Sequence, residues 1–173
     1  PGDEVLTPVP CFVEYGFYAD NHGGVLTTAP SRLDFQLDLT ALAAAVTPRT
    51  KVVLINSPNN PTGAVYSAES LNSLGALLEA KSKEFNRVIY LISDEPYRKV
   101  VYDGVAVPSI FTAYRESLIA TSYSKDISIP GERIGFVAVN PRASHRKALL
   151  GGMALANRIL GFVNAPALMQ RAV

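Results

Sequence analysis

The sequence predicts an α/β fold with three layers, α-β-α, built around a mostly parallel sheet. Apolar runs of strand length alternate with helical patterns along the chain, which favours a layered α/β arrangement. The runs are continuously apolar, and such runs are typical of strands that are covered on both faces. One connection between runs is too short for a crossover helix, and it predicts one antiparallel strand. The runs span residues 4–8, 24–29, 51–57, 87–93, 117–122 and 134–139.

Two helical patterns lie between these runs. The shorter one spans residues 38–46; it starts at Asp38 and stops before Pro48, because proline cannot continue a helix. The longer one spans residues 67–85, with Ser67 as its N-cap. Its apolar side chains fall on one stripe, which consists of Leu71, Leu74, Leu78 and Phe85.

The connection from residues 117–122 to residues 134–139 is the exception to the alternation. It contains Pro130 and Gly131 and leaves little room for a helix. We therefore expect these two strands to run antiparallel if they are neighbours in the sheet. Lys125 and Arg133 both lie in this connection.

Length and composition predict one globular domain. With 173 residues the chain is long enough for a single core of ordinary size. The hydrophobic fraction of 48% against 18% charged residues excludes a disordered chain. The chain has 16 lysine and arginine residues and 15 aspartate and glutamate residues, so its net charge is close to zero. This balance gives no indication of binding to nucleic acid or to a membrane surface.

Cysteine and histidine are too sparse for a metal site or a disulfide framework. Cys11 is the single cysteine, and His22 and His145 are far apart in the sequence. No apolar run is long enough to span a bilayer, so we expect a cytoplasmic protein. The chain opens on a strand-like run without methionine and closes without a helix stop, and we expect it to be a piece of a longer protein.

Polar loops follow three of the apolar runs. SPNNPTG begins at Ser57, DEPYR at Asp94 and SYSK at Ser122. In an open α/β sheet, ligands collect beyond the carboxyl ends of the strands. These loops together offer an amide, a carboxylate, a phenol, hydroxyls, a lysine and an arginine, which is a richer set than a structural loop needs.

These stretches resemble known signatures. SPNNPTG, then SDEPY, then SYSK followed by GERIG are similar, in this order, to the motifs of fold-type I pyridoxal 5'-phosphate enzymes, in particular the class I/II aminotransferases. The resemblance implies the large, cofactor-binding domain of that fold. Residues 1–173 would then form a single partial domain, with the N-terminal segment and the small C-terminal domain of the family absent. It also implies a homodimer of the full-length protein, with the active site at the interface.

The resemblance implies catalytic roles for three residues. Lys125 would form the internal aldimine with pyridoxal 5'-phosphate and then move the substrate proton; such a lysine must be partly neutral. Asp94 would pair with the pyridine nitrogen and keep it protonated, so that the ring accepts electrons. Tyr97 would donate a hydrogen bond to the phenolic oxygen of the cofactor. Glu95, beside Asp94, is expected to face another way.

Further residues would complete the cofactor site. Asn60 would share the phenolic oxygen with Tyr97, and the Asn60–Pro61 peptide is expected to be cis. Ser122 and Arg133 would hold the phosphate, with Ser124 a weaker candidate, because a hydroxyl and a planar guanidinium suit a dianion. Phe12 would stack on the ring, although Phe12, Tyr15 and Tyr18 recur at helical spacing and could simply belong to the core.

The implied function is transfer of an amino group between an α-amino acid and a 2-oxo acid. Lyases, decarboxylases and synthases of the same fold share every motif quoted above, so they remain an alternative. An aminotransferase-like sensor domain of a transcription regulator is another. A nicotinamide-binding fold is disfavoured, because no G-x-G-x-x-G follows the first strand. The fragment itself is expected to be weak or inactive, because the residues that bind the substrate carboxylate would lie outside it.

Overall fold

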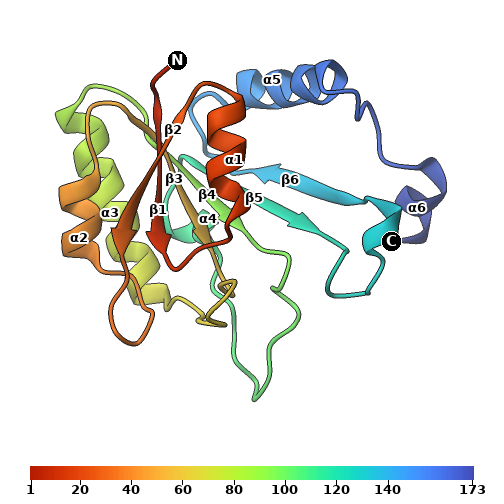
Figure 1. Ribbon diagram of the computed structural model, residues 1–173, viewed down its shortest axis with the longest axis horizontal. Helices are drawn as coiled ribbons and strands as arrows, with labels where there is room; N and C mark the ends of the chain where they lie inside the picture. Colours follow the sequence, from red (N-terminus) through yellow and green to blue (C-terminus); the bar gives the residue numbers. More distant parts are fainter.

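The computed structural model describes all residues from Pro1 to Val173. Its centre is a 6-stranded sheet in the order β2-β1-β3-β4-β5-β6, with helices on both faces (Figure 1). The strands are β1 (Glu4–Val9), β2 (Val25–Pro30), β3 (Thr50–Asn56), β4 (Tyr90–Asp94), β5 (Ser117–Ser122) and β6 (Gly135–Val139). The helices are α1 (Glu14–Asn21), α2 (Leu39–Ala45), α3 (Ala68–Glu84), α4 (Ile110–Ala113), α5 (Arg146–Ile159) and α6 (Ala167–Ala172), with a 3-10 turn, η1, at Pro130–Glu132.

The sheet is parallel except at one edge. β1 pairs in parallel with β2 and β3, and the parallel pairing continues through β4 to β5. β6 runs antiparallel to β5, as predicted from the short connection. In this register Asp94 lies opposite Ala120, and Ser122 lies opposite Gly135. The predicted α-β-α class with one antiparallel strand is therefore confirmed.

The main core lies between the sheet and the helices α2, α3 and α4. Val53, Ile55 and Leu91 point from the strands into this core, and none of them is exposed. The helices contribute Leu42, Leu71, Leu74, Leu78 and Ile110. Each such side chain stabilises the fold by about 1.5–3 kcal/mol when it is fully buried. These contacts hold β3 and β4, and therefore the loops at their carboxyl ends, in fixed positions.

The opposite face of the sheet is covered less evenly. Alternation along the strands turns Val52, Leu54 and Ile92 to this side, where α1 packs over a shallow cavity of about 310 Å³. At the sheet edge, Phe136 and Val137 on β6 point to opposite faces, and both are exposed. The expectation that the strands are covered on both faces is thus met in full for the central strands only. No helix is long and apolar enough to cross a membrane.

The predicted helix starts are confirmed by their caps. The side chain of Asp38 accepts a hydrogen bond from the amide of Ala41, and that of Ser67 accepts one from the amide of Ser70. β4 begins at Tyr90 rather than at the predicted position 87. The difference arises because the chain still turns after α3, with Asn86 in the left-handed region at φ 50°.

Candidate functional site

One cavity gathers the predicted site residues. It has a volume of about 420 Å³ and lies at the carboxyl ends of β4 and β5. The predicted residues that line it are Phe12, Asn60, Asp94, Tyr97, Ser122, Ser124, Lys125 and Arg133. They come from four separate segments of the chain, which follow β1, β3, β4 and β5, and the parallel sheet brings all four to the same edge. Their roles toward a cofactor stay predictions, since the structure carries no ligand.

Asp94 is the last residue of β4, and its carboxylate is held by one phenol. The hydroxyl of Tyr15 donates a hydrogen bond to Asp94 Oδ2 over 2.7 Å. Burial raises the pKa of Asp94 above its ordinary value, and the hydrogen bond from Tyr15 acts in the opposite direction. Glu95 does face away from the cavity: it is buried and pairs with Arg98 over 2.7 Å.

Asn56, the last residue of β3, ties two site loops together. Its Nδ2 donates to the backbone carbonyl of Asp94 over 2.7 Å, and its Oδ1 accepts a hydrogen bond from the backbone amide of Asn60. Because Asn56 is 3% exposed, both bonds are shielded from water. The SPNNPTG loop is thereby fixed relative to β4. The Asn60–Pro61 peptide is cis, as expected.

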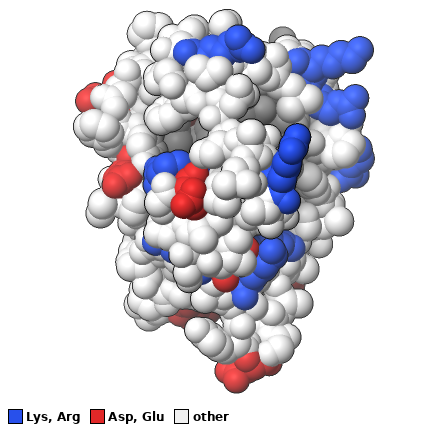
Figure 2. All heavy atoms as spheres, turned by 90° about the vertical axis from the view of Figure 1, so that its right-hand side faces the viewer, with Lys and Arg blue, Asp and Glu red and all other residues white.

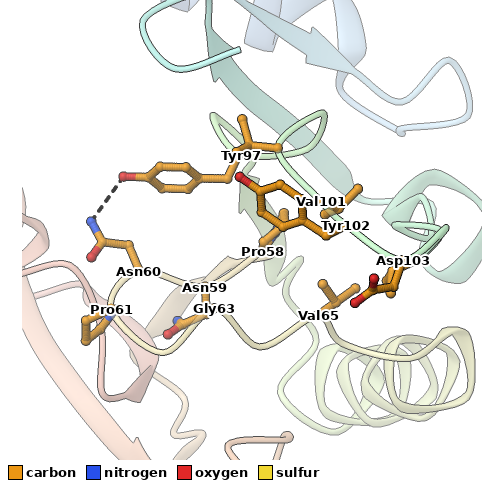
Figure 3. A pocket seen from close by; sticks show the side chains of 12 residues that line it. Pro58, Asn59, Asn60, Pro61, Gly63, Val65, Tyr97, Val101, Tyr102 and Asp103 are labelled. Atoms are coloured by element: carbon orange, nitrogen blue, oxygen red, sulfur yellow. Dashed lines mark hydrogen bonds between the residues drawn. The ribbon is translucent and has the colours of Figure 1, made fainter.

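Asn60 and Tyr97 form a wall between two cavities. Asn60 Nδ2 donates to Tyr97 Oη over 3.4 Å (Figure 3), and both residues line the site cavity. They also line a second, larger cavity of about 500 Å³ that lies between the SPNNPTG loop and the loop around Tyr102. The larger cavity contains no lysine, arginine or histidine. The cationic groups needed to bind a phosphate therefore lie only on the other side of this wall.

Lys125 lies in the connection after β5, and its amine has no partner on the protein. Its Nζ lies 6.0 Å from the centroid of the Tyr97 ring, and it forms no ion pair or hydrogen bond. The adjacent Asp126 is occupied instead by Lys99, over 3.2 Å. The loop is thus anchored next to Lys125 by a different lysine, and the amine of Lys125 has no ion-pair or hydrogen-bond partner in the protein.

Arg133 and Ser122 lie at the two ends of the same connection. Arg133 adopts the left-handed conformation at φ 51°, and its Nη1 donates to the carbonyl of Pro130 over 3.3 Å. It has no carboxylate partner, so its guanidinium can receive an anion. Beside Ser122, β6 approaches β5 so closely that a Cβ on Gly135 would overlap the carbonyl oxygen of Thr121. Glycine is therefore required at this position.

Phe12 lies at the cavity, just before α1 begins. Its ring meets that of Tyr15 edge to face, with centroids 5.6 Å apart and planes at 79°. The three aromatic residues at helical spacing have separate positions. Tyr15 is buried at 5% exposure, whereas Phe12 and Tyr18 line the cavity, and the hydroxyl of Tyr18 donates to Glu14. Phe12 thus lines the cavity beside Tyr15, and its stacking on a cofactor stays a prediction.

Sequence reasoning missed two residues that organise the site. Asn56 ends an apolar run directly before SPNNPTG, and its place at a strand end was the available signal. Tyr15 had only its helical spacing, which is equally typical of a core residue. Its contact with Asp94 joins positions 79 residues apart, so only the fold reveals it.

Comparison with known proteins identifies the family. The model of the family "Aminotransferase class I and II" matches residues 1–173. A probable aspartate aminotransferase of Methanocaldococcus jannaschii is 33% identical over 153 residues, which cover 88% of this chain and 39% of that protein. An aspartate aminotransferase of Geobacillus stearothermophilus is 38% identical over 143 residues, which cover 79% of this chain and 35% of that protein.

Solved structures agree in fold as well as in sequence. An aminotransferase of Eubacterium rectale superposes with a TM-score of 0.95 at 45% identity, covering 98% of this chain and 43% of the other. A mutated aspartate aminotransferase of Thermus thermophilus gives 0.80 at 33% identity, covering 95% and 42%. The chain thus spans less than half the length of these relatives. Its match to the family model over all its residues shows that it belongs to the class I and II aminotransferases.

Proposed function

We propose that this chain forms the cofactor-binding part of a pyridoxal 5'-phosphate-dependent aminotransferase. The observation that carries the proposal is a single cavity in which a partnerless lysine, Lys125, lies with a buried carboxylate, Asp94, and a partnerless guanidinium, Arg133. Membership of the aminotransferase family supports the same conclusion.

The donor set fits pyridoxal 5'-phosphate. The phosphate requires a cation and hydroxyl donors, which Arg133, Ser122 and Ser124 would provide. The pyridine nitrogen requires an anion, and only Oδ2 of Asp94 is engaged by a protein donor, so Oδ1 remains available. The cavity of about 420 Å³ is within the size range of small-molecule sites.

Each residue would then have a defined task. Lys125 Nζ would hold the cofactor covalently, and the same amine would take the proton from the substrate α-carbon and return it during the 1,3-shift. Asp94 would keep the ring nitrogen protonated. Asn60 Nδ2 and Tyr97 Oη would donate to the phenolic oxygen, and Phe12 would cover one face of the ring. Pyridoxal 5'-phosphate itself supplies the electron sink for the bond changes at the substrate.

The substrates would be an α-amino acid and a 2-oxo acid. Several relatives are described as aspartate or aspartate/prephenate aminotransferases, and one as an aromatic-amino-acid aminotransferase. These names differ in the amino acid but share the amino-group transfer. We therefore propose the reaction class and leave the side chain of the substrate unassigned.

A homodimer of the complete protein is part of the proposal. The last segment of the chain, from position 133 onward, contains no acidic residue, and its basic residues are Arg133, Arg142, Arg146, Lys147, Arg158 and Arg171. Figure 2 views the molecule from the side on which Figure 1 shows β6 and α6, and basic side chains lie along the top and upper right of this view. Apolar residues on α5 and beyond it are exposed, including Leu155, Ile159 and Phe162. All acidic residues lie before position 133, so a second copy offers the complementary charge.

The same proposal places the protein in the cytoplasm, where a single free cysteine stays reduced. Fractionation of cells that express the complete gene product tests this location. Recovery of the protein in an oxidising compartment would contradict it.

Reductive trapping tests the central assignment. The complete gene product that contains this chain is incubated with pyridoxal 5'-phosphate and borohydride, digested, and mapped by mass spectrometry. We expect the adduct on Lys125, no adduct in Lys125→Ala, and an unchanged adduct in Lys99→Ala, the lysine that pairs with Asp126. An adduct on another residue would refute the assignment. In a separate sample that is not treated with borohydride, adding an amino acid should convert the cofactor to its aminated form, which a lyase would not accumulate.

A further inference from the structure

Tyr15 is the one residue whose side chain forms a hydrogen bond with the Asp94 carboxylate. Its hydroxyl lies 2.7 Å from Asp94 Oδ2, and its side chain is 5% exposed. The contact crosses from α1, on one face of the sheet, to the end of β4. A buried hydroxyl needs a partner, but a backbone carbonyl would serve equally well, as it does for Tyr114, whose hydroxyl donates to Ile89 O over 2.9 Å. Satisfying the phenol therefore does not explain why its partner is a carboxylate.

The bond leaves the carboxylate in one orientation. Tyr15 occupies Oδ2 and no protein donor is hydrogen-bonded to Oδ1, so Oδ1 remains available on a residue that lines the cavity. The backbone of Asp94 is fixed separately by Asn56, whose Nδ2 donates to the Asp94 carbonyl over 2.7 Å. Backbone and side chain are thus held by two different donors, and neither donor uses the oxygen that would meet a ligand.

Electrostatics determine which protonation states of Asp94 and Tyr15 the contact favours. Burial raises the pKa of Asp94, which favours the neutral acid, while the Tyr15 hydrogen bond favours the carboxylate. Burial, followed by the charge of Asp94, raises the pKa of Tyr15 far above that of a free tyrosine, so Tyr15 remains a donor. The other titratable groups around the pair are Cys11, Tyr66, Tyr18, Tyr97, Glu14, Lys125 and Arg133.

The same ring also touches Phe12. The two rings meet edge to face at 5.6 Å, so the position of Phe12 at the cavity depends on Tyr15 as well. The Tyr15 side chain therefore contacts both the carboxylate expected at the pyridine nitrogen and the aromatic ring expected on the face of the pyridine.

We propose that Tyr15 is a positioning residue: through Oδ2 it orients and keeps ionised the Asp94 carboxylate that receives the ring nitrogen of the cofactor. This inference rests on the proposed function. It assigns the effect on Asp94 to the hydroxyl of Tyr15 rather than to its ring, and it predicts that this hydroxyl acts only through Asp94.

Equilibrium binding tests the proposal without using catalysis. The complete gene product is prepared without cofactor, and pyridoxal 5'-phosphate is titrated by fluorescence over a range of pH. Tyr15→Phe keeps the ring against Phe12 and removes only the hydroxyl. We expect its dissociation constant to rise about tenfold or more at neutral pH, the usual effect of losing a hydrogen bond to a charged group. The increase should shrink toward low pH, where the wild-type carboxylate is protonated as well.

Two further variants separate this role from a purely structural one. Tyr114→Phe removes a buried hydroxyl of the main core and should lower thermal stability without changing the dissociation constant. In an Asp94→Asn background, Tyr15→Phe should have no further effect on binding. Equal binding by wild type and Tyr15→Phe would overturn the proposal, as would an undiminished effect in the Asp94→Asn background.

The outcomes also distinguish this inference from the proposed function. If the wild type does not bind pyridoxal 5'-phosphate, both fail; if it binds and Tyr15→Phe binds equally, only the role of Tyr15 fails. Should Tyr15→Phe not fold, the wild type labelled with ¹³C at tyrosine Cζ replaces it. The Tyr15 resonance is then expected to shift when pyridoxal 5'-phosphate is added, while that of Tyr114 stays in place. An unchanged Tyr15 resonance would overturn the proposal.

Discussion

Replacing Gly135 by alanine should damage the phosphate end of the site through the backbone. Gly135 faces Ser122 across the antiparallel pair, and its new Cβ would overlap Thr121 O and lie 3.0 Å from Ser122 Cα. Both contacts are backbone atoms, which cannot move aside as the tip of a flexible side chain can. Either β6 must shift away from β5 or the strand end must distort. Both responses displace Ser122, and Arg133 two residues before the substitution moves too.

The loss of stability caused by Gly135→Ala follows from these close contacts. Overpacking a tight contact destabilises a protein by about 1–3 kcal/mol, and rigid backbone atoms favour the upper part of that range. In a domain of 150–250 residues each kcal/mol lowers Tm by roughly 2–4 °C, and the shift is smaller in a larger cooperative unit. Thermal unfolding of the complete gene product, together with its dissociation constant for pyridoxal 5'-phosphate, measures both effects. We expect a lower Tm and weaker cofactor binding.

Gly131 provides the matched control. It lies in the same connection, and a Cβ there would meet no atom within 4 Å. Gly131→Ala should therefore leave Tm and cofactor affinity close to wild type. The reasoning would be refuted if Gly135→Ala kept both values, or if the two alanine variants were equally impaired.

Three more predictions concern single side chains. Asp94→Asn should raise the Tm of the cofactor-free protein at neutral pH, because the pKa of Asp94 is raised in the folded protein and its ionised form is disfavoured there. This gain in Tm should vanish as the pH falls below 3.8, the ordinary pKa of the group, and a gain that persists at lower pH would contradict the electrostatic explanation. Arg133→Lys should weaken pyridoxal 5'-phosphate binding roughly ten- to a hundredfold in the same titration, since lysine lacks the bidentate fork, and an unchanged dissociation constant would exclude Arg133 from the phosphate site. Leu74→Ala should lower the free energy of unfolding by about 2–5 kcal/mol in urea, because Leu74 is fully buried, and a loss below 1 kcal/mol would mean that the core closes around the gap.

Much of the fold could be predicted from local patterns. The apolar runs are close in position to the strands, and the caps at Asp38 and Ser67 fix the starts of two helices. The antiparallel edge followed from the length of one connection. The short helix α4 was missed, because four residues do not establish a helical period. The start of β4 was placed too early, since an apolar run continues through the turn at Asn86.

The candidate site could be predicted only where residues are consecutive. Motifs around Asn60, Asp94 and Lys125 place polar groups at strand ends, and the parallel sheet then brings them together. The Tyr15–Asp94 bond depends on how α1 crosses the sheet, which no local pattern contains. Asn56 was overlooked for a different reason: a polar residue at a strand end is ordinary, and its two hydrogen bonds to neighbouring loops appear only in three dimensions.

The connection between β5 and β6 carries Lys125 and Arg133 on one short piece of backbone. Both of its ends are fixed by strand pairing at Ser122 and Gly135. The spacing between the two cations therefore depends on the length of this connection rather than on the packing of separate elements. Deleting one residue from the connection should displace both cations together. The loop at 102–105, which borders the second cavity, is by contrast the place where a change in length should leave the cations undisturbed.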